Sequence, residues 1–394
     1  MTRPSDSVSQ RAIVCALLTL IVAGLAVVSQ HSGNVALWLE REVSIPYEGI
    51  TLHGVLTLPV SEGTHPAFAL ITGAAGPKGR GGVSEWAHVT HANRLALQGF
   101  ACLRYDPPGV GRSEGERGVD TVESRATEAV AVVEFLRLQP EVNSDQVGLW
   151  GVSQGGWVIA MAAAKAPEAI AFLIMASGTT VSVAEQQVYG VEVQSIAAGV
   201  AGEDLAKAVV VSRLLIDWQV SEPIFQKRNE YEIARLGEGP WADFAEIVYG
   251  DVSLSPEEEL DWVIEILEVI DAEDWSGSLY LGELYIPALR SIPPESFAAG
   301  LEAASRSLLA DPREYFERIA CPMLALFGEN DLHVPVEQSV TLLEEYFSAG
   351  GNEDLTIVVF PDAGHSLNDF MAVYWESLYA WLEALEASWD SPGS

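Results

Sequence analysis

Apolar residues follow two patterns along the chain. In residues 43–59 they alternate with polar ones on either side of a Glu48-Gly49 pair, which predicts a β-hairpin. Farther on, short and almost continuous apolar runs alternate with segments of helical periodicity. These runs are residues 67–73, 101–106, 146–151, 169–177, 322–328 and 355–360. Because buried parallel strands are apolar on both faces and are connected by helices, the pattern predicts a mostly parallel, doubly wound α/β sheet.

The alternation stops at about Val183 and resumes after Pro312. Helical periodicity dominates the segment between them. This segment contains four tryptophans, Trp218, Trp241, Trp262 and Trp275. We interpret residues 183–312 as a helical cap inserted into an α/β core that comprises residues 36–182 and 313–394. The tryptophans are expected to pack inside the cap, although a lid over an apolar site would also use large aromatic surfaces.

A hydrophobic segment precedes the predicted core. Arg3 and Arg11 come before an apolar run of 17 residues, Ala12–Val28. As a helix this run would be about 25 Å long, between the core of a signal peptide and a bilayer span. A basic flank ahead of the run favours export of the chain beyond it. We therefore expect residues 1–35 to form a hydrophobic helix that is a signal anchor or a signal peptide. The rest of the chain would then be held at the cell membrane, or be secreted or periplasmic.

The composition argues against several classes of protein. Lys and Arg number 21 against 56 Asp and Glu, and the net charge of −35 is spread along the chain. Such a surface repels phosphate groups, so no nucleic-acid partner is expected. The three cysteines, Cys15, Cys102 and Cys321, are too few for a disulfide scaffold and form no zinc motif. Neither a metal nor an organic cofactor is predicted, and the oligomeric state is left undetermined.

One short motif indicates chemistry. Residues 151–155, GVSQG, match G-x-S-x-G between the apolar run 146–151 and the helix-like segment 157–166. On a sharp strand-to-helix turn, the glycines let strand and helix approach each other, and Ser153 projects above the sheet as a nucleophile. The N–H of Gln154 would then face a developing oxyanion. A plain glycine-rich turn can have the same letters, so the rest of the chain must decide.

A serine nucleophile needs a base and an orienting carboxylate. Asp331 and His365 follow the last two apolar runs, and Ser153, Asp331, His365 is the chain order of α/β-hydrolases. Both residues fall at the carboxyl ends of predicted strands, where open α/β sheets build their sites. A second oxyanion donor is expected from the N–H of Ala74, in the small-residue loop after the run 67–73.

Three residues compete for these roles. Glu329 and Asp362 are alternative carboxylates, and His333 is an alternative base on the loop of the acid. We prefer Asp331 for its distance past the strand, and His365 because it follows the last strand.

With these residues in place, the chain resembles the bacterial α/β-hydrolases of the EstD-type esterase group, related to serine aminopeptidase-like and dienelactone hydrolase-like proteins. Beyond the three residues, the resemblance rests on the stretches GAAGPKGRGG (73–82), LALQGFACLRYDPPGVGRSEG (95–115) and SGTTVSVAEQQ (177–187). It implies an α/β-hydrolase fold, esterase-like activity on a small-molecule acyl substrate, and Ser153, Asp331 and His365 as catalytic residues. Val152 and Gln154 replace the histidine and glutamate that often flank the nucleophile in this group.

The sequence thus predicts a serine hydrolase that cleaves carboxylic esters. An aminopeptidase-type peptidase is the alternative, and it would need carboxylates in the cap to hold the substrate ammonium. A membrane-tethered binding protein on a hydrolase scaffold is a further alternative, because a fold alone does not confer activity.

Overall fold

The computed structural model describes residues 37–72, 83, 85–115, 121–251, 254–367 and 371–389. The predicted N-terminal hydrophobic helix, with all of residues 1–35, lies outside these ranges, as does Ala74. Within them, no helix combines the length and the apolar character that a bilayer span requires.

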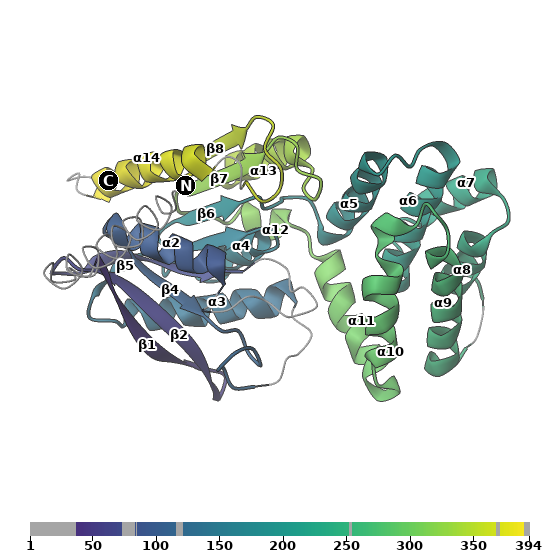
Figure 1. Cartoon of the computed structure of the whole chain (residues 1–394), viewed down its shortest axis with the longest axis horizontal. Helices are drawn as coiled ribbons and strands as arrows, with labels where there is room; N and C mark the ends of the chain where they lie inside the picture. Colours follow the sequence, from purple (N-terminus) through teal and green to yellow (C-terminus); the bar gives the residue numbers. More distant parts are fainter. Residues whose placement is uncertain are drawn as a thin grey trace, which may run out of the picture.

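One eight-stranded sheet organises the core (Figure 1). Its strands are β1 (Trp38–Tyr47), β2 (Ile50–Pro59), β3 (His65–Ile71), β4 (Ala101–Tyr105), β5 (Val142–Val152), β6 (Leu173–Ala176), β7 (Met323–Gly328) and β8 (Leu355–Phe360). Their order in the sheet is β1-β2-β4-β3-β5-β6-β7-β8. Every pair from β4 to β8 is parallel, whereas β1 and β2 pair antiparallel with their neighbours. The predicted mostly parallel α/β sheet is therefore confirmed.

The predicted hairpin is also confirmed, and its turn has a local cause. Tyr47 pairs with Ile50 across Glu48 and Gly49, which have φ angles of 45° and 85°. Two consecutive residues with positive φ are what a two-residue hairpin turn requires, and glycine adopts this conformation without strain.

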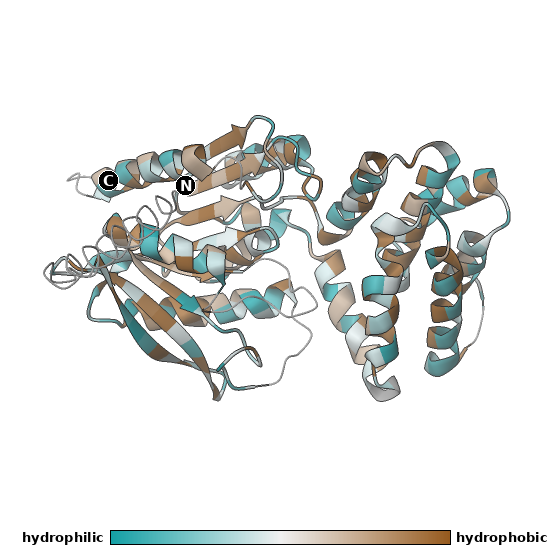
Figure 2. Ribbon diagram, viewed as in Figure 1, coloured by the Kyte–Doolittle hydropathy of each residue, from teal (hydrophilic) through white to brown (hydrophobic). Residues whose placement is uncertain are grey.

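Helices cover both faces of the sheet. Along β3, Ala67, Ala69 and Ile71 pack into one hydrophobic cluster, while Phe68 and Leu70 pack into another, as the two-residue period of a strand requires. The first cluster includes α3 (Val122–Arg137), α4 (Gly155–Lys165), α12 (Arg313–Phe316) and α13 (Val336–Gly350). The second includes α2 (Trp86–Leu97) and α14 (Met371–Trp389). Burial on both faces explains why β6 and β7 consist of apolar residues alone, and Figure 2 shows these strands largely in brown.

A group of helices between β6 and β7 stands beside one end of the sheet (Figure 1). Its members are α5 (Val183–Ala197), α6 (Gly202–Trp218), α7 (Gln226–Leu236), α8 (Pro240–Tyr249), α9 (Pro256–Asp271), α10 (Ile286–Ser291) and α11 (Pro294–Leu309), with a short 3-10 turn (Gly277–Leu279) and a π turn (Leu281–Tyr285) before α10. They enclose a hydrophobic cluster of their own. We call this group the cap helices.

The tryptophan prediction is right for three residues and wrong for one. Trp218, Trp241 and Trp275 are buried in the cluster of the cap helices. Trp262 is 48% exposed. The buried side chains of α9 recur at intervals of three and four residues from Leu260, and position 262 falls outside that stripe.

Candidate active site

Ser153 occupies a sharp turn between β5 and α4. Its φ is 53°, a left-handed conformation that costs a non-glycine residue free energy. Its N–H donates to Ala176 O at 2.9 Å, which anchors the turn to β6. A Cβ on Gly151 would lie 2.5 Å from Gly155 O, and one on Gly155 would lie 2.9 Å from Thr72 O. The two glycines of the motif therefore let the strand, the helix and the end of β3 approach one another.

Three side chains from separate loops meet at this turn. His365 Nε2 lies 3.1 Å from Ser153 Oγ, and His365 Nδ1 lies 2.7 Å from Asp331 Oδ2. Asp331 follows β7 and His365 follows β8, so the parallel sheet brings the two loops together at one edge. A carboxylate beside Nδ1 keeps the proton on that nitrogen, which leaves the Nε2 lone pair facing the serine hydroxyl.

The Asp331 carboxylate is buried and held by its own loop. Oδ1 accepts hydrogen bonds from the N–H groups of His333 at 2.7 Å and Val334 at 3.1 Å. The side chain has no exposed surface. A buried carboxylate that accepts three hydrogen bonds has one fixed orientation, so it can orient the imidazole of His365.

The competing residues have other partners. Glu329 Oε2 accepts a hydrogen bond from Asp362 N at 3.1 Å, and both residues are exposed. The ring of His333 lies 4.8 Å from that of His365, and its Nδ1 is 3.4 Å from Gln194 Nε2 of α5. Burial, and then the neighbouring His365, lower the pKa of His333, while Asp331 opposes them. Of the candidate residues, the structure therefore brings Ser153, His365 and Asp331 together.

The predicted oxyanion donor Gln154 directly precedes α4. The N–H groups at the start of a helix have no acceptor within that helix, and the N–H of Gln154 is one of them. It is therefore available to an oxyanion. The predicted second donor, Ala74, lies outside the described residues, although β3, which leads to it, ends beside the turn of Ser153.

A buried arginine that our sequence reasoning missed connects these two elements. Arg125 of α3 donates from one nitrogen to Gln154 Oε1 and from another to the carbonyl oxygen of Thr72, and it is fully buried. The sequence holds a signal for it. Arg125 lies three residues after Val122 and four before Ala129, on the apolar stripe of an amphipathic helix, where a charge needs buried partners.

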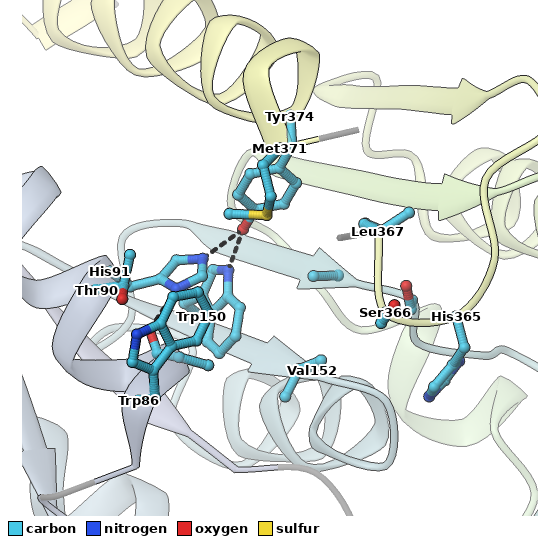
Figure 3. Close-up of a pocket in the computed structure, with 13 residues that line it drawn as sticks. Trp86, Thr90, His91, Trp150, Val152, His365, Ser366, Leu367, Met371 and Tyr374 are labelled. Atoms are coloured by element: carbon cyan, nitrogen blue, oxygen red, sulfur yellow. Dashed lines mark hydrogen bonds between the residues drawn. The ribbon is translucent and has the colours of Figure 1, made fainter. Parts of the chain in front are cut away.

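Two cavities lie near the three side chains. One, of about 150 Å³, borders His365 on the α2 and α14 side (Figure 3). The other, of about 170 Å³, lies between the cap helices and His333. No Asp or Glu is among the described residues that line either cavity. Across the described part of the chain, no group of His, Cys, Asp or Glu side chains is arranged to hold a metal ion.

Two family models match separate parts of the chain. The model of the X-Pro dipeptidyl-peptidases (S15 family) matches residues 48–236, and that of the dienelactone hydrolase family matches residues 301–387. Both matches fall mainly on the sheet and the helices that cover it, and residues 237–300 of the cap helices lie between them.

Curated relatives match a limited segment. An uncharacterized protein of Pseudomonas aeruginosa is 36% identical over 110 residues, which are 28% of this chain and 28% of that protein. A polyketide transferase of a Penicillium species is 33% identical over 120 residues, 30% of this chain and 37% of that protein. A thiohydrolase of Aspergillus aculeatus is 34% identical over 111 residues, 28% of this chain and 32% of that protein. The chain thus spans about a third of the length of these relatives.

Solved structures extend the likeness of fold to most of the chain. The structure of a hypothetical protein of Pseudomonas aeruginosa has a TM-score of 0.50 and 17% identity, and the match covers 89% of this chain and 94% of that one. The structure of an α/β-hydrolase of a Penicillium species has a TM-score of 0.50 and 20% identity, with 86% and 96% covered. Together with the family models and the sheet, these findings show that the chain belongs to the α/β-hydrolase superfamily.

Proposed function

We propose that this protein is a serine hydrolase that cleaves carboxylic esters through an acyl-enzyme intermediate. The observation that carries the proposal is the continuous contact from Ser153 Oγ to His365 and from His365 to the buried Asp331, at 3.1 and 2.7 Å. The distance between Ser153 and His365 allows direct proton transfer, and the distance between His365 and Asp331 is that of a strong charge-assisted hydrogen bond.

The roles of the residues derive from this geometry. Ser153 Oγ attacks the ester carbonyl while His365 Nε2 takes its proton, and Asp331 stabilises the imidazolium that forms. The N–H of Gln154, and that of Ala74, would stabilise the tetrahedral oxyanion. His365 then returns the proton to the oxygen of the leaving alcohol. A water molecule, activated by the same histidine, hydrolyses the acyl-enzyme and restores Ser153.

Two features favour this proposal over the alternatives. An aminopeptidase would bind the substrate ammonium with carboxylates, and the described residues around both cavities include none. A pure binding protein would gain nothing from the strained backbone of Ser153, which costs about 1–3 kcal/mol. Strain of this kind is useful where a nucleophile must project from its turn.

The test is ester hydrolysis by the full chain. We expect turnover of p-nitrophenyl acetate and labelling by a fluorophosphonate probe. Ser153→Ala should abolish both, with a loss in kcat of roughly a million-fold. Ser144→Ala, an exposed serine at the start of β5, serves as the matched control and should leave both unchanged. Labelling that persists in folded Ser153→Ala would refute the assignment of the nucleophile, and turnover of aminoacyl-p-nitroanilides in place of esters would make the protein a peptidase.

A further inference from the structure

The cavity beside His365 has no part in the proposed catalytic steps. It lies between α2 and α14, at the carboxyl ends of β5 and β6, and encloses about 150 Å³. Its walls are mainly aromatic and aliphatic, as Figure 3 shows for Trp86, Trp150, Leu367, Met371 and Tyr374. A cavity with so few polar groups is suited to an apolar ligand.

This cavity adjoins residues next to the reacting serine. Val152, which directly precedes Ser153, forms part of its wall, and so does His365 itself. Ala176 is another wall residue, and its carbonyl accepts the hydrogen bond from the N–H of Ser153 at 2.9 Å. When the carbonyl carbon of an ester lies at Ser153 Oγ, either its acyl part or its alcohol part can therefore extend into this cavity.

The polar groups in the floor of the cavity satisfy one another. His91 Nδ1 lies 2.7 Å from Ala87 O, so this nitrogen carries the proton and Nε2 accepts. Tyr374 donates its hydroxyl proton to His91 Nε2 at 2.8 Å and accepts from Trp150 Nε1 at 3.0 Å, as the dashed lines in Figure 3 show. Burial lowers the pKa of His91 to about 4, so the ring stays neutral at pH 7.

All three hydrogens of this network are thus already donated within it. A charged or hydrogen-bond-accepting group placed against His91, Trp150 and Tyr374 would lose its water and find no free donor on these three side chains, at a large cost in free energy. A hydrocarbon group would lose nothing. The floor therefore selects against polar groups as well as favouring apolar ones.

The described wall residues also include three with hydroxyl groups, Thr90, Ser177 and Ser366. Ser177 Oγ is buried and has no hydrogen-bond partner among the residues that the structure describes. Its residue directly follows Ala176, whose carbonyl accepts the hydrogen bond from the N–H of Ser153. On another side of the cavity, Trp86 is 71% exposed among the described residues and forms part of the wall.

We propose that this cavity binds one uncharged hydrocarbon group of the ester, about the size of a benzene ring. The inference rests on the proposed esterase function and adds a substrate class to it. The hydrocarbon group lies against Trp150 and Tyr374, and the polar atoms of the ester lie toward Ser177. Either the acyl part or the alcohol part of the ester supplies this group, and the two sources are separable by experiment.

The experiment compares kcat/KM for two ester series with the full chain. The first series keeps methanol as the alcohol and varies the acid from acetate through hexanoate to phenylacetate. The second keeps acetate as the acid and varies the alcohol from methanol through hexanol to benzyl alcohol. We expect kcat/KM to rise about tenfold or more toward the ring-bearing ester in one series, because each well-packed methylene contributes roughly that much. The series that rises identifies the part that the cavity binds.

Two substitutions in the wall change the size of the cavity. Ala87→Leu fills part of it and should lower kcat/KM for the ring-bearing ester more than kcat/KM for methyl acetate, which removes the preference for the ring. Met371→Ala enlarges it and should move the preference to larger groups. Ala234→Leu, on the exposed face of α7, is the matched control and should leave the ranking unchanged. Unfolding in urea establishes that each variant is folded before its ranking is compared.

The outcomes separate the two proposals. Methyl acetate turnover that survives Ser153→Ala refutes the proposed function. If turnover depends on Ser153, but both series are flat in the wild type or Ala87→Leu leaves a rising series unchanged, the proposed function stands and the inference about the cavity is wrong.

Discussion

Gly151→Ala is the substitution for which the structure makes the sharpest prediction. A Cβ at this position would lie 2.5 Å from Gly155 O and 2.8 Å from Gly155 C, whereas ordinary contacts begin at 3.4 Å. Both atoms belong to the backbone, so no side chain can rotate away. The end of β5 and the first turn of α4 must therefore separate by about 0.9 Å, which displaces the residues between them.

This displacement acts on Ser153, which lies between the two glycines. Its Oγ is 3.1 Å from His365 Nε2, and a shift of about 1 Å removes that contact or bends it. A misplacement of this size reduces catalysis about 100-fold, and the crowding lowers the free energy of unfolding by about 1–3 kcal/mol. We therefore expect a large fall in kcat in a protein that still folds.

The assay combines ester kinetics with unfolding in urea. Gly300→Ala, in the interior of α11, is the matched control, because an added Cβ there meets no atom within 4 Å. This control should keep full activity and gain about 0.5–1 kcal/mol of stability, since alanine is the better helix former. If Gly151→Ala retains wild-type kcat, the reasoning that the glycine is needed for close approach of strand and helix is refuted.

Three further predictions concern buried polar groups. Asp331→Asn should lower kcat about 10⁴-fold with little loss of stability, because an amide no longer holds the proton of His365 on Nδ1; a loss below tenfold would contradict this role. Arg125→Met removes the guanidinium that links the turn of Ser153 to β3 and leaves two buried oxygen acceptors without their donor. The free energy of unfolding should therefore fall by about 1–3 kcal/mol, and kcat should fall more than KM rises. An effect on stability alone would make Arg125 purely structural. Burial lowers the pKa of His91 to about 4, so on acidification this histidine takes up a proton in the unfolded chain before it does so in the folded protein. His91 should therefore contribute roughly 2 kcal/mol to the stability that the protein loses between pH 7.5 and pH 5. Urea unfolding at the two pH values should show a smaller loss in His91→Phe, and an equal loss in both proteins would refute the assignment.

Local patterns were sufficient to predict much of this protein from its sequence. Strands β6 and β7 consist of apolar residues alone because helices cover both faces of the sheet, and this requirement is readable in each strand separately. The turn at Ser153 is equally local, since its steric needs fall on glycines two residues away on either side. The chain order of Asp331 and His365 then derives from the topology, because successive parallel strands end at the same edge.

Choices between neighbouring residues were harder to make from sequence alone. Glu329 and Asp331 are two positions apart in the same loop. Only the path of that loop places Asp331 against His365 and Glu329 against the N–H of Asp362. The exposed position of Trp262 depends in the same way on how α9 rotates its apolar stripe toward the other cap helices.

Contacts between distant segments were decided by the tertiary structure. Arg125 meets Gln154 and the end of β3 only after α3 packs on the sheet. The cavity beside His365 requires α2 and α14, whose contact between His91 and Tyr374 joins residues 283 positions apart. A sequence determines which side chains prefer to be buried, but the partners that a buried polar group meets depend on the packing of whole elements, so the hydrogen-bond network of this cavity had no local signature.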